Sequence, residues 1–372
     1  MLQPIVRQFK DLGLSIGVQS VVIKGVTAVL RLILAGLVCR HFAPNQFVDF
    51  VLFLGFTSII PFLDLGVGGI AFRRKLVNLD PQDLVGEEHL FFETFSRMFK
   101  LFGFYAILAL GIKAFIPSSN FNPICALILF MRIPFILPNE YLFSKLKMRL
   151  VYSLEVIEHL LLVAFIGVGV QFLAESQLEL GYAAVMAFFT LGYFSIFIRK
   201  KGWKIRYIKG DFQFSSDEWF HSLQAFLAAF FLVFIPYVVN HFNTIQDTYE
   251  FNIGFRLISI ALGASLVVFN ALFTRFLQIH QSGSRLPLKP FFTFLSLFVG
   301  FVAVSYFAVY EKTFQLMAGF SIENPLLHHL LFLWSICVFL FLGLDQILKT
   351  YSVRFSALVW IVFYFTSLVF VV

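Results

Sequence analysis

Eleven long apolar runs, joined mostly by short polar segments, make up most of this 372-residue chain. A helix crosses the ~30 Å hydrocarbon core of a bilayer with about 20 apolar residues. It also hydrogen-bonds its own backbone, which lipid requires. The runs predict membrane-spanning helices at residues 12–39, 47–71, 98–116, 122–143, 152–173, 179–198, 218–240, 250–273, 290–310, 326–344 and 355–372. The predicted fold class is an all-α polytopic membrane protein with about 11 transmembrane helices.

The composition agrees that lipid is the solvent of this chain. Hydrophobic residues make up 59% of it and charged residues 13%, whereas soluble domains carry about 25% charged residues. The three cysteines, Cys39, Cys125 and Cys337, lie in or at the edge of apolar runs. An odd number at wide spacing favours neither a disulfide framework nor a zinc site, so we expect no metal and no cofactor.

Lysine and arginine orient the predicted helices, because cytoplasmic loops are enriched in both. With the N-terminus in the cytoplasm, 21 of the 28 basic residues fall in cytoplasmic segments, and only Arg40 and Lys312 lie on the opposite side. The net charge of +7 follows from this topology, so we expect no nucleic-acid partner.

A basic segment, Arg199–Arg206, divides the predicted helices into six and five. After it, Asn240–Gln246 repeats parts of Arg40–Gln46 at an offset of 200, and each segment follows the first helix of its half. Repeated halves with an even number of spans are related by an axis along the membrane normal. We therefore predict two lobes, residues 1–212 and 213–372. The apolar ending indicates a short or truncated second lobe.

The first apolar run carries a polar residue at every third or fourth position, namely Gly17, Ser20, Lys24, Thr27 and Arg31. On an α-helix this spacing places all five on one face. A cation at the bilayer centre costs roughly 3 kcal/mol even on a lenient insertion scale. The stripe is therefore predicted to face a wet, protein-lined cavity, where positive charge favours an anionic substrate.

Other predicted helices also carry cations at depth. Arg132 is followed by two prolines, which free backbone carbonyls and kink a helix, and lipid tolerates such a break only beside protein or water. Lys113 lies within a turn of a helix end, where its side chain snorkels to the membrane surface. The eighth run has a polar stripe of its own. The predicted substrate-binding residues of the cavity are Lys24, Arg31, Arg132, Arg256, Ser20, Thr27, Asn252 and Ser259.

Asp64 is a candidate for a coupling or structural role. It lies inside the second run, after Pro61 and before Gly66. The position fits pairing with a cavity cation, capping of a broken helix end, or proton transfer during coupling. The structural roles are the favoured interpretation.

Glu155, Glu158 and His159 are the other candidates for coupling or structure, and they share one face near the cytoplasmic end of the fifth run. Such a cluster fits a proton relay. A solvated helix end facing the basic residues 145–149 is the favoured interpretation.

Motifs for catalysis are missing from the sequence. It has no glycine-rich phosphate loop, no metal-ligand cluster and no paired carboxylates in a sizeable extramembrane domain. The longest predicted outer loop, at 311–325, is too short to hold a folded active site. We therefore expect no catalytic residues and do not expect an enzyme.

Three segments carry a resemblance to a known family: Arg40–Phe47, Leu63–Arg74 and Tyr249–Leu257. They resemble the motifs of bacterial polysaccharide-export flippases in the multidrug/oligosaccharidyl-lipid/polysaccharide exporter superfamily. The resemblance implies two helical lobes around a central cavity. The chain departs from the family pattern at Val48-Asp49, where a glycine is usual.

The resemblance also implies a function. The chain is expected to flip a polyprenyl-pyrophosphate-linked oligosaccharide, of the kind used for O-antigen and lipopolysaccharide, across the bacterial inner membrane. H⁺ or Na⁺ is the expected coupling ion. The main alternative is a multidrug or cation antiporter of the same superfamily, which needs acidic cavity residues. A membrane-embedded glycan polymerase is a third interpretation, and short outer loops argue against it.

Overall fold

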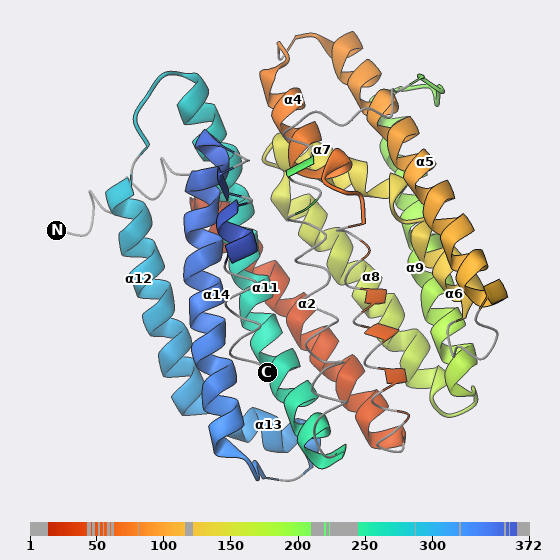
Figure 1. Cartoon of the computed structure of the whole chain (residues 1–372), viewed down its shortest axis with the longest axis vertical. Coiled ribbons are helices and arrows are strands. Elements are labelled where there is room, and N and C mark those ends of the chain that lie inside the picture. Colours follow the sequence, from red (N-terminus) through yellow and green to blue (C-terminus); the bar gives the residue numbers. More distant parts are fainter. Residues whose placement is uncertain are drawn as a thin grey trace. The chain divides into compact units, whose positions relative to one another are not determined.

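The computed structural model describes residues 14–42, 63–80, 82–115, 122–209, 245–286, 288–319 and 321–352, with isolated positions between 46 and 60, between 219 and 223, and between 355 and 362 (Figure 1). Every regular element among these residues is a helix, so the all-α prediction is confirmed. Six helices in this part of the chain are long and apolar enough to cross a membrane: Leu84–Phe115, Pro123–Ser144, Met148–Gly169, Glu175–Lys201, Phe291–Leu316 and Pro325–Tyr351. The chain is a multi-pass membrane protein. The predicted spans at 218–240 and 355–372 lie largely outside the described residues.

The chain packs into two compact units. Unit 1 draws on residues 1–51, 146–163 and 235–356, and unit 2 on residues 52–145, 164–234 and 357–372. Each unit consists of segments that pack together, whereas each predicted lobe is one continuous stretch of the sequence. The lobe boundary at residue 212 therefore stays a prediction.

Unit 1 is built around α11 (Ile245–Gln281), which packs against α2 (Leu14–His41) and α14 (Pro325–Tyr351). α11 is longer at both ends than the predicted span at 250–273. Three shorter elements follow α11 in the chain: α12 (Leu288–Ser305), the π-helical η4 (Tyr306–Tyr310) and α13 (Glu311–Ala318). The first part of α8 (Met148–Gly169), up to residue 163, also belongs to this unit.

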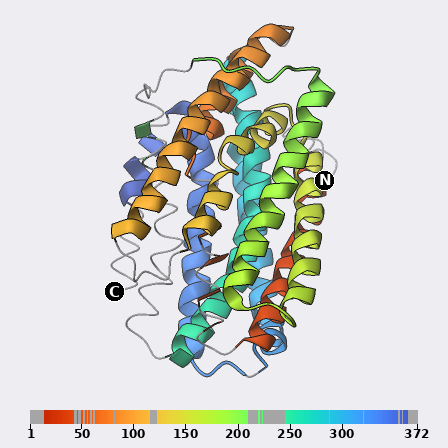
Figure 2. The ribbon, with the colours of Figure 1, turned by 90° about the vertical axis from the view of Figure 1, so that its right-hand side faces the viewer.

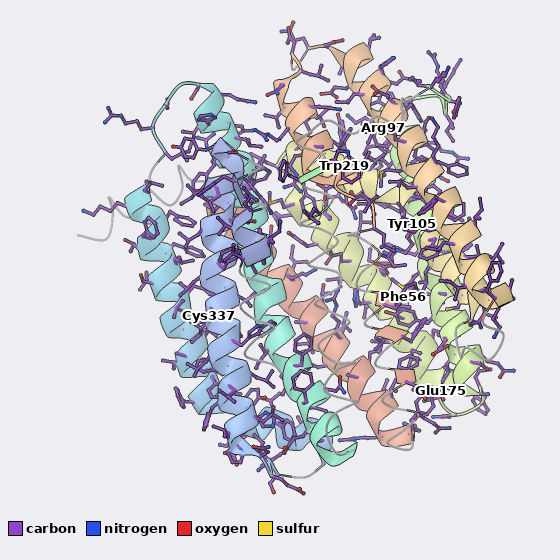
Figure 3. The ribbon with its side chains drawn as sticks, viewed as in Figure 1. Phe56, Arg97, Tyr105, Glu175, Trp219 and Cys337 are labelled. Carbon is purple, nitrogen blue, oxygen red and sulfur yellow. The ribbon has the colours of Figure 1, made fainter. Side chains whose placement is uncertain are left out.

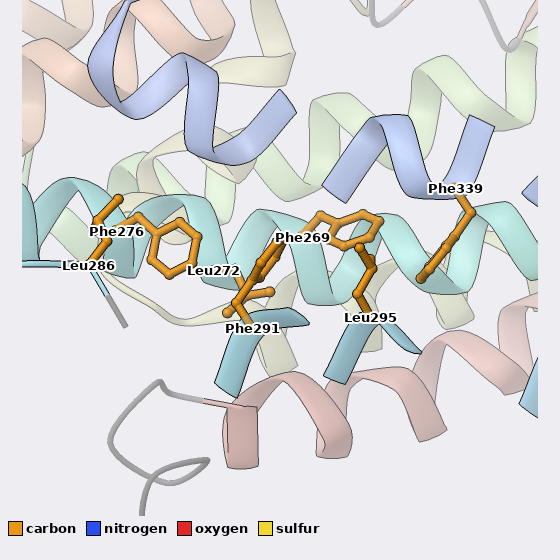
Figure 4. Close-up of a cluster of buried hydrophobic side chains, with 7 residues drawn as sticks. All are labelled: Phe269, Leu272, Phe276, Leu286, Phe291, Leu295 and Phe339. Carbon is orange, nitrogen blue, oxygen red and sulfur yellow. The ribbon is translucent and has the colours of Figure 1, made fainter. Parts of the chain in front are cut away.

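An apolar core joins three helices of unit 1 (Figure 4). It consists of Phe269, Leu272 and Phe276 from α11, Leu286 from the next loop, Phe291 and Leu295 from α12, and Phe339 from α14. A Cβ added to Gly343 of α14 would lie 2.8 Å from Cδ1 of Leu295, so the glycine allows α12 to approach closely. In lipid, van der Waals packing of this kind holds helices together, because hydrocarbon supplies no hydrophobic drive.

Unit 2 contains η2 (Val67–Ala71), α4 (Phe72–Asn78), α5 (Leu84–Phe115), α6 (Pro123–Phe130), η3 (Pro134–Ile136), α7 (Leu137–Ser144), the end of α8 and α9 (Glu175–Lys201). α6 packs along α9 and α5 (Figure 2). The Phe95 ring of α5 stacks on the Phe194 ring of α9, with the ring centres 5.2 Å apart. The Phe135 ring contacts Phe194 edge-on, with the ring centres 4.8 Å apart. The ring centres of Trp203 and Phe91 lie 5.1 Å apart, so the basic segment Arg199–Arg206 packs against α5.

α5 begins at Leu84 and not at residue 98 as predicted. Oδ1 of Asp83 accepts a hydrogen bond of 2.8 Å from the amide of Gly86, which caps the earlier start. The helix therefore includes Arg97, which lies just before the predicted span at 98–116. Figure 3 labels Arg97 and Tyr105 along α5, and Arg97 is buried.

The predicted break in the span at 122–143 is confirmed. α6 ends at Phe130, a turn and the short η3 follow, and α7 begins at Leu137. Pro134 and Pro138 lie at the starts of η3 and α7, where their missing amide hydrogens interrupt an α-helical ladder.

The outer loop predicted at 311–325 is partly helical, which corrects that prediction. α13 occupies Glu311–Ala318, and Phe314 on it is fully buried. The helix ends at Gly319, whose φ of 81° lies in the left-handed region that glycine adopts without a Cβ penalty. The anchored aromatic ring therefore extends helical structure into a segment whose polarity indicated a loop.

Candidate functional site

The polar face of α2 meets α8 within unit 1. Nζ of Lys24 donates a hydrogen bond in an ion pair to Oε2 of Glu155, 131 positions later in the chain. The side chain of Lys24 is 14% exposed and that of Glu155 is 25% exposed, so both are largely shielded. Nζ of Lys24 also lies 5.3 Å from the ring centre of Tyr152, a cation–π distance. α8 thus supplies a counter-charge for the first cation of the predicted stripe.

Arg31, two turns further along α2, meets His159, one turn further along α8. Nε of Arg31 donates to Nε2 of His159 at 2.9 Å. Because arginine can only donate, Nε2 must be the unprotonated nitrogen. Nδ1 therefore carries the hydrogen, and it donates to the backbone carbonyl of Glu155 at 2.8 Å. His159 is neutral in this arrangement, and it orients Arg31 without neutralising it.

Arg31 has free capacity for an anion. Its side chain is exposed, and in the described part of the chain its two terminal nitrogens have no hydrogen-bonding partner and no carboxylate at ion-pair distance. A guanidinium presents its terminal N–H groups as a planar fork that matches the oxygens of a phosphate or carboxylate. Among the described residues, Arg31 is thus an oriented cation without a counter-charge on the polar face of α2.

Glu158 and His159 are buried, with 5% and 8% of their surfaces exposed. The favoured interpretation of a solvated helix end facing residues 145–149 is therefore wrong for these two residues. Glu158 lies within electrostatic range of Lys24, and the first lysine of 145–149 pairs with Glu87 in unit 2 instead. The physical reason is that α2 places its own cations against this face of α8, a contact that the spacing within α8 does not reveal.

The small polar residues of the α2 face are also buried. Ser20 and Thr27 are both 0% exposed. Oγ1 of Thr27 has no hydrogen-bonding partner among the described residues, although it lies on the same face as Lys24 and Arg31. At these two positions the face of α2 is therefore covered by protein, whereas at Arg31 it is exposed.

The second predicted stripe lies on α11, which packs against α2. Asn252 on it is buried, at 3% exposed. Arg256 and Ser259 follow it by about one and two turns, and their side chains lie outside the described residues. Their part in a binding site stays a prediction.

Asp64 lies in the turn that precedes η2 in unit 2, and its coupling or structural role stays a prediction. It is buried, and its Oδ1 accepts a hydrogen bond of 2.9 Å from the amide of Gly66. Leu65 and Gly66 have φ values of 52° and 72°, so the chain turns sharply before η2 begins. A Cβ on Gly68 would lie 3.2 Å from Oδ2 of Asp64 and nearer still to Met98, which explains a glycine there.

Arg132 belongs to unit 2, in the turn between α6 and η3. It is half-buried, and its backbone carbonyl accepts a 3.0 Å hydrogen bond from the amide of Phe135. Whether it shares a cavity with the cations of unit 1 stays a prediction.

Unit 2 also holds a buried ion pair and a buried hydrogen bond from a tyrosine to a carboxylate, neither of which was predicted. Nη2 and Nε of Arg73 donate to Oε2 of Glu140 at 2.6 and 3.1 Å, and Arg73 is 3% exposed. The hydroxyl of Tyr141 donates to Oε2 of Glu87 at 2.5 Å. One available signal was the place of Arg73 near the end of Leu63–Arg74, a segment that carries the family resemblance, and no local signal pointed to Glu87.

No protein-family model matches this chain, and no curated protein matches it in sequence. Solved structures do match its fold. A MATE in complex with MaD3S superposes with a TM-score of 0.66 at 13% identity, over 94% of this chain and 84% of that one. A multidrug resistance MATE family transporter of the MOP superfamily in an outward-facing conformation gives 0.62 at 13% identity, over 94% and 82% of the two chains. One in an inward-facing conformation gives 0.55 at 12% identity, over 91% and 84%.

At this level of identity the likeness concerns the fold alone. The similar solved structures are MATE transporters of the MOP superfamily, and the motifs of this chain resemble another branch of that superfamily. The closer resemblance to polysaccharide-export flippases stays a prediction. The chain has the all-helical membrane fold of MATE transporters.

Proposed function

We propose that this chain is a membrane transporter that flips a lipid-linked, anionic oligosaccharide from the cytoplasmic to the outer leaflet of a bacterial inner membrane. The fold that it shares with MATE transporters supports transport. The motifs that resemble polysaccharide-export flippases support the cargo. The cargo would be a polyprenyl-pyrophosphate-linked oligosaccharide used for surface polysaccharide such as O-antigen.

The observation that carries the proposal is the state of Arg31. A neutral His159 holds its Nε, and its terminal nitrogens are unoccupied among the described residues. A binding site for cations would instead present a carboxylate without a counter-charge. The exposed guanidinium therefore favours a cargo with phosphate oxygens.

Lys24 becomes the second contact when cargo binds. In the structure the carboxylate of Glu155 already pairs with Lys24. The pyrophosphate must therefore displace this carboxylate to reach Lys24. Exchange of one anion for another leaves the number of charge-assisted hydrogen bonds unchanged, each worth roughly 1.5–3 kcal/mol. Binding is therefore reversible, which a flippase needs on the release side.

The remaining predicted residues extend this site in the proposal. Arg132, Arg256, Asn252, Ser20, Thr27 and Ser259 line the wider cavity, and the polyprenyl tail stays in lipid. The lobes at residues 1–212 and 213–372 then rock to alternate access. The N-terminus lies in the cytoplasm, as the charge bias predicts, and H⁺ or Na⁺ drives the cycle.

A multidrug or cation antiporter is the second candidate. Glu155 and Glu158 lie about one turn apart on α8 near Lys24, and carboxylates are what a cationic drug needs. Two of the similar solved structures are multidrug resistance transporters. For this function a cationic drug would have to replace Lys24 as the partner of Glu155.

The experiment that separates the two candidates is complementation of a flippase-deficient bacterial strain. Wild-type protein should restore surface polysaccharide. Lys24→Ala should reduce restoration about tenfold or more, because 1.4 kcal/mol is one decade, and Lys24→Glu should reduce it further by repelling phosphate. Lys113→Ala is the control, since Lys113 lies near the end of α5.

Membrane abundance is measured for every variant. Normal polysaccharide export by a well-expressed Lys24→Glu protein would rule out an anionic cargo at this site. Loss of resistance to cationic drugs in Glu155→Gln, with export unaffected, would establish the antiporter instead.

A further inference from the structure

A second buried polar cluster lies in unit 1. It consists of Glu250 on α11, Tyr310 at the end of η4 and His328 on α14. Glu250 and His328 are both 1% exposed. All three residues are titratable, and none belongs to the proposed cargo site.

Glu250 is held as an acceptor by backbone amides. Its Oε1 accepts a 2.6 Å hydrogen bond from the amide of Glu323, and its Oε2 accepts one of 3.1 Å from the amide of Asn324. These bonds tie the start of α11 to the loop that leads into α14. An ionised carboxylate has only acceptor sites, so two donating amides favour that form.

His328 lies between Glu250 and Tyr310. Its Nδ1 is 2.5 Å from the hydroxyl of Tyr310, a hydrogen bond. Its Nε2 is 3.8 Å from Oε1 of Glu250, which is too long for a hydrogen bond but close enough for an ion pair. Nε2 has no hydrogen-bonding partner among the described residues.

One neutral form of His328 fits both neighbours in part. The Tyr310 hydroxyl donates to Nδ1, and Nε2, which then carries the hydrogen, lies 3.8 Å from Oε1 of Glu250. In the other neutral form Nδ1 donates, and the lone pair of Nε2 faces the negative Glu250. Protonation adds a positive charge beside the carboxylate of Glu250, so the imidazolium gains an ion pair that neither neutral form has.

We propose that Glu250, His328 and Tyr310 form a proton-binding site. A hydronium ion delivers its proton to Nδ1 of His328 and leaves as water, while the Tyr310 hydroxyl rotates from donor to acceptor. The imidazolium then pairs with Glu250 through Nε2–H. Uptake of one proton strengthens the link between α11 and α14 and changes no covalent bond other than N–H and O–H.

The elements around the cluster carry several other titratable groups, among them the exposed Glu311 and Lys312 on α13 and the exposed Glu323 in the loop before α14. His329 follows His328 and bonds through Nδ1 to the hydroxyl of Tyr306 at 3.0 Å. From α13, the Phe314 ring lies 4.9 Å from the His328 ring. The end of α2, which packs on α13, carries the exposed Arg40 and His41. Glu250 is thus the carboxylate at ion-pair distance from His328 in the described part of the chain.

In the proposed transport cycle, the proton that binds at this site is the coupling ion. It enters at the end of unit 1 that is predicted to face outside. That role depends on the proposed function. Proton binding by the cluster does not depend on any cargo. A test of binding can therefore fail or succeed independently of the flippase proposal.

The test uses the full-length protein with ¹⁵N-labelled histidine in lipid nanodiscs. Imidazole nitrogen shifts are followed between about pH 8 and pH 5, the range in which histidine charge normally changes. His328→Gln identifies the signals of His328 by their loss. These signals should move from neutral to imidazolium values within the range.

Glu250→Gln keeps an acceptor oxygen but removes the charge. It should lower the proton affinity of His328 tenfold or more, because an opposite charge at this distance commonly shifts titration by about 1–3 pH units. His280→Gln is the control, because His280 lies in the last turn of α11, at the opposite end from Glu250; it should leave the titration of His328 unchanged. If Glu250→Gln does not fold, Tyr310→Phe supplies the second variant, and it should lower the affinity several-fold.

Two results overturn the proposal. One is a His328 that stays neutral down to about pH 5. The other is a His328 that titrates identically in the wild type and in the folded Glu250 or Tyr310 variant.

Discussion

Lys24 on α2 and Glu155 on α8 form an ion pair although 131 positions separate them in sequence. The pair shows that part of the polar stripe on α2 is neutralised by another helix. A cation at depth in a membrane needs water or a counter-charge, and Lys24 has found the counter-charge. Arg31, held by a neutral histidine, has no counter-charge among the residues that the structure describes. Lys24 must therefore release Glu155 before it can bind another anion, whereas Arg31 can bind one directly.

Mutual dependence of Lys24 and Glu155 is the first prediction. Lys24→Ala and Glu155→Ala should each destabilise the protein by about 1–3 kcal/mol, below the range for fully buried pairs because both side chains keep some exposure. The double variant should lose less than the sum of the two, with a coupling energy of roughly 1–3 kcal/mol. Thermal unfolding in detergent measures this cycle. Simple additivity would mean that the pair does not form.

Arg31 should be sensitive to geometry as well as to charge. Arg31→Lys keeps the positive charge but loses both the bond from Nε to His159 and the planar fork. Flipping by this variant should fall between the wild type and Arg31→Gln. His159→Phe should weaken flipping less than Arg31→Gln, because it releases the guanidinium without removing it. A His159→Phe variant as inactive as Arg31→Gln would contradict a purely orienting histidine.

The packing around His328 predicts an effect of one added methyl group. A Cβ on Gly254 would lie 2.9 Å from Nδ1 of His328 and from the hydroxyl of Tyr310. Gly254→Ala should therefore destabilise the protein by about 1–3 kcal/mol through overpacking. Gly300→Ala on α12 is the matched control, since nothing lies within 4 Å of its added Cβ. The control should be neutral or slightly stabilising, because alanine favours a helix over glycine. Equal thermal stability of both variants would contradict the close packing of α11 against His328.

Membrane orientation gives a further prediction from the charge bias. A reporter fused after Lys209 should be active only in a cytoplasmic form, and one fused after Ser321, in the loop before α14, only in an external form. Inverted activities would reverse the sides of access in the transport proposal.

Sequence alone predicted the helical membrane fold and the face of α2 on which Lys24 and Arg31 lie. Both follow from periodicity within one helix. The partners on α8 could not be assigned, because contacts across more than a hundred residues leave no periodic trace in a single sequence. Glu155, Glu158 and His159 were found as a cluster, and the protein surroundings of the two buried members, Glu158 and His159, were mistaken for solvent.

Other misses have local causes. α13 was taken for a loop because its polar residues outweigh Phe314, whose burial anchors the helix. His328 was not predicted as a site residue, because two adjacent histidines in an apolar run form no periodic pattern. Its role depends on Glu250 and Tyr310, which contact it from other elements.

The central claim is that Arg31 receives an anionic cargo, and a reconstituted flipping assay tests it most directly. Wild type, Arg31→Gln and Arg285→Gln are placed in liposomes at equal density with a polyprenyl-diphosphate-linked oligosaccharide, and the rate of its transfer between leaflets is measured. Arg285 is an exposed arginine in the loop after α11 and serves as the matched control. Loss of a charge-assisted contact of roughly 1.5–3 kcal/mol should slow flipping about tenfold or more in Arg31→Gln and leave Arg285→Gln at the wild-type rate. Wild-type flipping by Arg31→Gln would contradict the account.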